Sequence, residues 1–293
     1  MATLRDIKRR IGGVRNTQKI TKAMKMVAAA RLNKAQENII NARPYSRKLA
    51  EVLGQLLATE KNFKHPLIED RGNEKVAIIP VTSDRGLCGA FNVNIITSVE
   101  KLLSDKYSDQ VKSNNLSLYC VGKKARDYFV NHDHNVTEGF TGIFSDLKFE
   151  FVSQLNKNLT SRFLNGDLDK IIVVYNRFKS VAQQEVVQLE LYPIRPEVAE
   201  DSEQKAIDYI FEPDKVSIIN TLLPRYLNAQ MWTILLNSYA AELGARMTAM
   251  EMASENAEEM IQSLQLTYNK RRQASITNEI LEIVSGANAL KES

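Results

Sequence analysis

The sequence predicts a mixed α/β protein. Long helices at the two ends of the chain are expected to form an antiparallel coiled coil, and the residues between them to form a central α/β domain. Three observations support this. Residues 225–293 contain no proline and repeat apolar side chains at heptad spacing, residues 3–43 do the same, and residues 75–195 alternate strand and helix patterns. The expected boundaries are 1–60, 75–195 and 205–293.

The C-terminal helix is too long to be buried in its own domain. At about 1.5 Å per residue it would measure roughly 100 Å, whereas a compact domain is about 30 Å across. Its apolar seam consists of Ala240, Leu243, Met247, Met250, Ser254, Ala257, Ile261, Leu264 and Tyr268. After Lys270–Gln273 the seam changes phase and continues as Ile276, Ile280, Ile283, Ala287 and Leu290. The spacing also fits a helix packed on its own domain, but the length favours a partner.

The N-terminal helix is basic and has a matching seam. Leu4, Ile7, Ile11 and Val14 are three and four residues apart, and Ile20, Met24 and Val27 continue one step out of register. Residues 1–48 hold thirteen Lys or Arg and two acids, a net charge of +11, while residues 225–293 have a net charge of −2. Opposite charge favours an antiparallel pair.

Two other interpretations of this basic helix are open but less favoured. A nucleic-acid-binding arm would use the Lys and Arg side chains on phosphates, but no aromatic residue precedes Tyr45. A targeting presequence would be rich in serine, which is absent before Ser46.

The middle of the chain predicts a Rossmann-like domain with a mostly parallel sheet. Strands are expected at 75–82, 116–121 and 170–175, with an edge strand at 185–192, and helices at 90–103, 123–131 and 144–164. Pro193, Pro196 and the acidic residues of 197–203 indicate an exposed connector.

Composition excludes several classes of protein. With 44% hydrophobic and 25% charged residues, the chain has the make-up of a soluble globular protein. The longest uncharged run of the C-terminal helix, 226–241, is too short and polar to span a bilayer, and no signal peptide is expected. Cys88 and Cys120 are expected to be buried free thiols in a reducing compartment, and His132 and His134 to be loop residues without a metal.

One motif lies where α/β proteins bind phosphate. Ser83-Asp84-Arg85-Gly86-Leu87-Cys88-Gly89 follows the first strand and precedes a helix. It is neither a dinucleotide fingerprint nor a P-loop, so we expect the glycines to provide positive φ angles and close packing. No catalytic arrangement and no cofactor site is indicated, although an enzyme with a nucleotide site is the alternative to a helical interaction protein.

Four segments resemble one family. They are 16–28 (NTQKITKAMKMVA), 83–89 (SDRGLCG), 268–275 (YNKRRQAS) and 276–289 (ITNEILEIVSGANA). In this order and over nearly the whole chain, they are similar to the gamma subunit of F-type ATP synthases, of the bacterial type.

The resemblance implies a rotor subunit. The terminal helices would form a shaft inside a ring of three alpha and three beta subunits, with the α/β domain near the epsilon subunit and the membrane c ring. The shaft would transmit torque that couples hydrogen ion transport to ATP synthesis or hydrolysis. The family's gamma subunit is non-catalytic, so no cofactor, direct nucleotide binding or nucleic acid is expected. The implied location is peripheral, on the cytoplasmic face of a bacterial membrane.

The resemblance also implies contact residues. Contacts to the alpha/beta ring are expected at Met24, Arg246, Lys270, Arg271, Arg272, Gln273 and Glu279. Foot contacts near the c ring are expected at Arg43, Tyr45, Tyr209 and Glu212. The small, apolar end of the C-terminal helix, 283–290, would turn inside an apolar collar.

Overall fold

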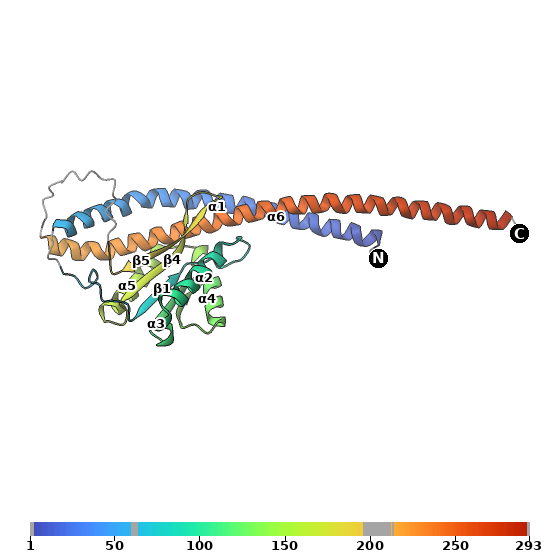
Figure 1. Ribbon diagram of the computed structural model, residues 1–293. Coiled ribbons are helices and arrows are strands. Elements are labelled where there is room, and N and C mark those ends of the chain that lie inside the picture. Colours follow the sequence, from blue (N-terminus) through green and yellow to red (C-terminus); the bar gives the residue numbers. More distant parts are fainter. Residues whose placement is uncertain (1–2, 60–63, 196–211, 213, 292–293) are drawn as a thin grey trace. The chain divides into compact units, whose positions relative to one another are not determined.

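A computed structural model describes residues 3–59, 64–195, 212 and 214–291 (Figure 1). Helix α1 spans Leu4–Thr59 and helix α6 spans Lys215–Lys291. The elements between them are β1 (Val76–Pro80), α2 (Phe91–Lys101), a π-helical turn (Leu102–Lys106), α3 (Ser108–Lys112), β2 (Leu116–Val121), α4 (Lys123–Asn131), β3 (Val136–Phe140), a 3-10 turn (Ile143–Ser145), α5 (Phe149–Leu164), β4 (Lys170–Phe178) and β5 (Gln184–Tyr192). The chain divides into two compact units, Met1–Ala28 with Met247–Ser293, and Ala29–Arg246.

The sheet confirms the predicted α/β class. Its strand order is β3-β2-β1-β4-β5. The first four strands are parallel, and β5 pairs antiparallel with β4 at the edge. The central strands are buried on both faces, which explains why β1 and β4 read as continuous apolar runs.

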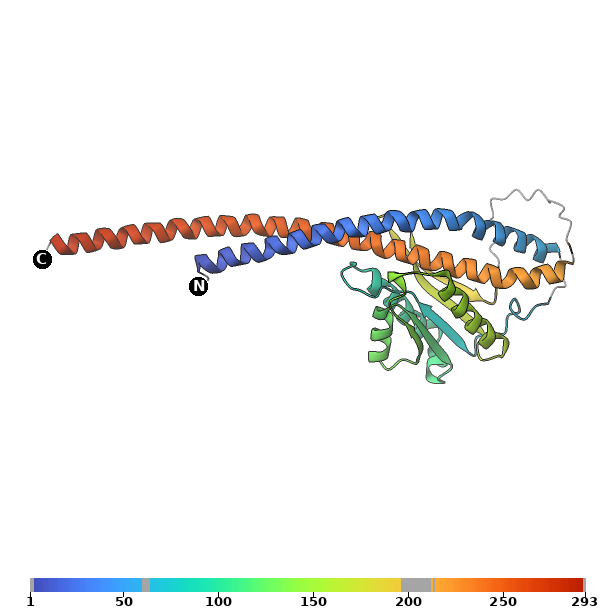
Figure 2. The same ribbon diagram turned by 180° about the vertical axis from the view of Figure 1, so that it is seen from behind.

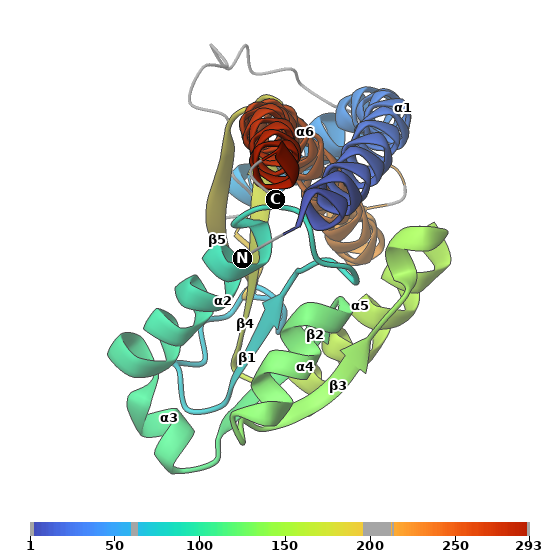
Figure 3. The ribbon, with the colours of Figure 1, turned by 90° about the vertical axis from the view of Figure 1, so that its right-hand side faces the viewer.

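Each face of the sheet is covered by helices of the same unit (Figure 3). On one face, alternate residues of β1, β2 and β4 pack with α2 and α4, including Ile78, Cys120 and Ile95. On the other face they pack with α5 and with parts of α1 and α6, including Leu53 and Leu235. The α/β layer and these helix segments therefore share one core.

Three elements differ from the sequence prediction: α5, β3 and the short helix α3, which was not predicted. Helix α5 begins at Phe149 rather than at residue 144, because Gly142 is left-handed (φ 79°) and Lys148 is extended (φ −113°, ψ 146°). The short strand β3 was not predicted from the sequence. Its residues are alternately half-buried and exposed and include Gly139, so they form no apolar run.

Both terminal helices continue through a proline. Pro44 lies inside α1 and Pro224 inside α6, and both side chains are exposed. Proline removes one backbone hydrogen bond from a helix, and on an exposed face water can bind the carbonyl left over. The helices therefore extend beyond the proline-free stretches from which they were predicted.

Both cysteines are buried free thiols, as predicted. Burial raises the pKa of the Cys120 thiol to about 12. His132 is exposed and stacks on Tyr128, and His134 is half-buried 3.4 Å from Glu100. Within the described ranges, no cluster of His, Cys, Asp or Glu has the make-up of a metal site, and no helix is long and apolar enough to cross a membrane.

Candidate functional site on the terminal helices

The two ends of the chain pair as antiparallel helices. Three polar contacts, which we call the polar ladder, join α1 and α6: Gln18 with Glu258, Thr21 with Ser254 and Lys25 with Glu251. The residue number falls on α6 as it rises on α1, which confirms the predicted antiparallel orientation. The hydroxyls of Thr21 and Ser254 lie 2.6 Å apart in the buried seam.

The α6 seam matches the heptad prediction. Met250, Ser254, Ala257 and Ile261 are buried, and the seam is half-buried as far as Tyr268.

The predicted continuation of the α1 seam is wrong. Ile20 and Val27 are 60% and 53% exposed, while Gln18, Thr21 and Ala28 are buried. The heptad continues in phase from Val14. It places the polar Gln18 and Thr21 in the seam, and the apolar Ile20 and Val27 outside it. Spacing would have placed Gln18 and Thr21 in the seam, had polar residues been allowed at seam positions, but it does not give the α6 residues that they meet.

Beyond the start of α1, helix α6 runs on without a partner from this chain among the described residues (Figure 1; Figure 2). Its large apolar side chains there are 48–71% exposed: Ile276, Ile280, Leu281, Ile283 and Val284. Soluble proteins rarely expose so many large apolar side chains together unless the surface binds a partner. The second apolar run of α6, which was predicted after the phase change, is therefore exposed at each position whose side chain the structure describes: Ile276, Ile280, Ile283 and Ala287.

The predicted ring contacts beyond residue 269 of this helix are accessible. Four exposed residues follow one another around the helix: Lys270, Arg271, Arg272 and Gln273. Glu279 is also exposed, and its carboxylate accepts a 3.4 Å hydrogen bond from the Ser275 hydroxyl. Met24 is half-buried on α1 beside the polar ladder. These residues all belong to the same compact unit.

The predicted foot residues lie in the other unit. Arg43 and Tyr45 are exposed on α1, and Glu212 is exposed just before α6. Tyr209 lies outside the described residues.

Arg246 makes contacts within its own chain, which the sequence did not predict. Its guanidinium pairs with Glu242 at 2.5 Å and donates a 2.6 Å hydrogen bond to the Gly86 carbonyl. Burial raises the pKa of the Glu242 carboxyl, and the hydrogen bond and charge of Arg246 oppose that shift. The i, i+4 spacing of Glu242 and Arg246 was the available sequence signal.

The glycine turn, residues 83–89, is hydrogen-bonded to the first turn of α2. The Ser83 amide donates to the Asn92 side chain at 2.9 Å, and the Asn92 amide group donates to the Ser83 hydroxyl at 2.8 Å. Gly89 has the expected positive φ (57°), whereas the second left-handed residue is Leu87 (φ 65°) and not Gly86. Ser83 and Asn92 therefore bind each other.

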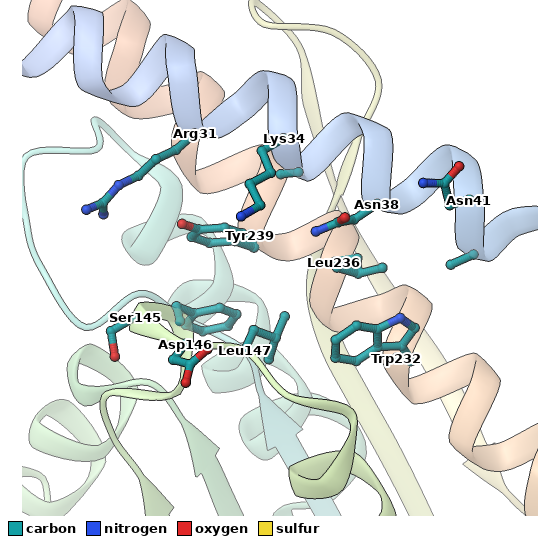
Figure 4. A pocket seen from close by; sticks show the side chains of 13 residues that line it. Arg31, Lys34, Asn38, Asn41, Ser145, Asp146, Leu147, Trp232, Leu236 and Tyr239 are labelled. Atoms are coloured by element: carbon teal, nitrogen blue, oxygen red, sulfur yellow. The ribbon is translucent and has the colours of Figure 1, made fainter.

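A cavity of about 510 Å³ lies between α1, α6 and the loop after β3 (Figure 4). Phe144 stacks on Tyr239 with ring centroids 5.7 Å apart. Burial raises the pKa of the Tyr239 phenol, and the nearby Arg31 cation opposes that shift. Lys34 and Asn38 point into the space in Figure 4, so the cavity has a polar wall on α1 and an aromatic wall on α6.

Comparison with known proteins identifies the family. A family model described as ATP synthase matches residues 3–290. The ATP synthase gamma chain of Chlorobium phaeobacteroides is 46% identical over 99% of this chain and 100% of its own length, and that of Chloroherpeton thalassium is 45% identical over the full length of both.

Solved structures share the fold. A chain of the Euglena gracilis mitochondrial ATP synthase in one rotational state has a TM-score of 0.68 at 20% identity, covering 98% of this chain and 94% of its own. A chain of the rotor of the same enzyme has a TM-score of 0.65 at 21% identity, covering 93% and 98%. With a family model matching almost every residue and full-length relatives near 45% identity, the chain belongs to the ATP synthase gamma chain family.

Proposed function

We propose that this chain is the central rotor shaft of an F-type ATP synthase and transmits torque between a membrane c ring and a catalytic alpha/beta ring. The observation that carries this function is the single, unpaired stretch of α6 with its exposed apolar side chains. A helix with this surface suits rotation inside a collar, because apolar contacts have no fixed direction and can be exchanged as the shaft turns.

The polar contacts of the shaft lie at the base of this stretch. We propose that Lys270, Arg271, Arg272 and Gln273 bind polar groups of the ring, and that Glu279 does so one to two turns further on. Met24 would support the same region from α1. Charge-assisted hydrogen bonds of Arg are directional, so they are suited to contacts that form and break at defined angles of rotation.

Arg246 is proposed to act on coupling indirectly, since its guanidinium is bound within the chain. At the membrane end, Arg43, Tyr45 and Glu212, with Tyr209, are proposed as foot contacts to the c ring. The three segments 1–60, 75–195 and 205–293 would then act as shaft, side module and shaft. The module would contact the epsilon subunit.

The chain itself is proposed to be non-catalytic. The glycine turn, which is its best candidate for a nucleotide site, is bonded to Asn92 and Arg246 instead. The alpha and beta subunits, three of each, would hold the nucleotides. The location proposed is the cytoplasmic face of a bacterial membrane, as a peripheral subunit.

The test is truncation of the proposed ring contacts in the assembled complex. Arg272→Ala, alone and with Gln273→Ala, should slow ATP hydrolysis and reduce the protons pumped per ATP. Each lost charge-assisted bond would cost about 1.5–3 kcal/mol. The melting temperature of the isolated chain should not change, because the Arg272 side chain is exposed.

Gln265→Ala is the matched control, because Gln265 is also exposed on α6 but lies within the paired stretch. Unchanged hydrolysis and pumping in the double variant, with an intact assembly, would contradict the proposed contacts. A marked fall in the melting temperature of the isolated chain would show that Arg272 stabilises the fold instead.

A further inference from the structure

We propose that Arg246 and Glu242 form a latch that holds the turn 83–89 against α6, and that this latch makes the α/β module and α6 move as one body during torque transfer. The functional part rests on the proposed shaft function. The latch itself follows from contacts within one compact unit, Ala29–Arg246.

The latch is a nearly buried ion pair. The side chains of Arg246 and Glu242 are 12% and 10% exposed, one helical turn apart on α6. Both Nε and Nη2 of Arg246 donate to Glu242 Oε1, at 3.2 and 2.5 Å. A charge this deeply buried is costly without its partner, so the two side chains hold each other in place.

The same guanidinium binds the turn. Its Nη1 donates to the Gly86 carbonyl at 2.6 Å, and its Nη2 approaches the Arg85 carbonyl at 3.4 Å. The planar fork of an Arg can bind a carboxylate and two carbonyls in one geometry, which a Lys cannot reproduce. Arg246 is therefore a bridge between α6 and the backbone of the turn.

The turn is strained where the latch binds it. The next residue, Leu87, has a left-handed backbone (φ 65°) and a side chain that is 65% exposed. A non-glycine residue in this conformation persists only where its surroundings enforce it. Cys88 lies directly behind, 1% exposed, with its sulfur 3.2 Å from the Asn92 amide group.

Through Asp84, the turn 83–89 is also hydrogen-bonded to two other loops. Asp84 accepts hydrogen bonds from the Lys123 amide at 3.0 Å and the Gly142 amide at 2.9 Å. These amides follow β2 and β3, so loops after three parallel strands meet at this turn. Arg246 ties that group of loops to α6, which makes it a positioning residue.

The latch is tested by the accessibility of Cys88 to a thiol reagent in the isolated chain. Arg246→Gln should raise the labelling rate of Cys88 at least tenfold, because the turn opens when its carbonyls lose the guanidinium. Glu242→Gln should raise this rate as well, because Arg246 loses the carboxylate that holds it in place. Cys120, buried in β2, is the internal reference and should keep its rate. Arg246→Lys should restore protection only in part, and Arg225→Gln, at an exposed position of α6, should not change either rate.

An unchanged Cys88 rate in Arg246→Gln would overturn the latch. So would equal acceleration of Cys88 and Cys120, since that indicates general loosening of the fold.

The functional part is tested in the assembled complex. Arg246→Gln should lower the protons pumped per ATP, while Arg225→Gln should not. Faster Cys88 labelling with normal pumping would overturn the positioning role. If the unmodified chain fails to assemble with alpha and beta subunits, the shaft function fails, and the labelling experiment still decides the latch.

Discussion

Removing the hydroxyl pair of the polar ladder should cost little stability. Thr21 and Ser254 lie 2.6 Å apart, but each has a second bond within its own helix. The Ser254 hydroxyl lies 2.7 Å from the Met250 carbonyl, and the Thr21 hydroxyl lies 3.0 Å from the Gln18 carbonyl. Because each hydroxyl has one hydrogen, one of the two donates across the pair while the other donates to the carbonyl of its own helix. In Thr21→Val or Ser254→Ala, the hydroxyl that remains therefore stays hydrogen-bonded.

The magnitudes follow from these second bonds. A lost hydrogen bond costs about 0.5–1.5 kcal/mol, whereas an unpaired buried polar group would cost about 1–3 kcal/mol. Thr21→Val also buries one more methyl group, which contributes about 0.8 kcal/mol in the opposite direction. We expect each single variant to lose at most about 1 kcal/mol, and the double variant to lose no more than the sum of the two.

The assay is hydrogen exchange of the amides of residues 14–28, which reports the opening free energy of the helix pair. Thr17→Val is the control, because Thr17 is exposed and its hydroxyl bonds the Gly13 carbonyl of its own helix at 3.2 Å. A loss well above about 1.5 kcal/mol in either single variant would contradict this prediction, because it would mean that the remaining hydroxyl is left unpaired.

Three further outcomes are expected. Gly122→Ala should lower the unfolding free energy by about 2–6 kcal/mol in urea titration, because φ is 93° and the new Cβ would lie 2.1 Å from the Thr82 carbonyl. Gly166→Ala is the control: φ is 76° but the new Cβ would meet no atom within 4 Å, so the unfolding free energy should fall by only about 1–2 kcal/mol. Equal losses in the two variants would contradict the steric argument for Gly122. The raised pKa of Cys120 makes stability fall from pH 9 toward 12, so Cys120→Ala should flatten that fall. Amides of 276–288 should exchange fast in the free chain, and slow exchange there would be evidence against an unpaired helix.

Much of the fold was predictable because local patterns agree with the tertiary structure. The continuous apolar runs of β1 and β4 identify strands that are covered on both faces. The heptads of α6 identify a seam that is buried from Met250 to Ile261. Strand β3 has no such pattern, because it is held by its pairing with β2 rather than by its own apolar side chains.

The candidate site was predictable only in part. Ile20 and Val27 misled because apolar residues on the outer face of α1 have the same spacing as a seam. The polar ladder and the Arg246 latch depend on which side chains meet across helices and turns, and periodicity does not contain that information. The exposed positions of Arg272 and Gln273 follow from where α1 begins relative to α6.

Rotation of this chain inside its ring is the most direct evidence for the proposed shaft function. The chain would be assembled with alpha and beta subunits fixed to a surface, and a probe attached in the α/β module, for example at the exposed residue Lys112. On addition of ATP the probe should turn continuously in one direction, in three main steps per revolution, and stop when ATP is removed. A complex that hydrolyses ATP at full rate while the probe stays still would contradict the shaft function.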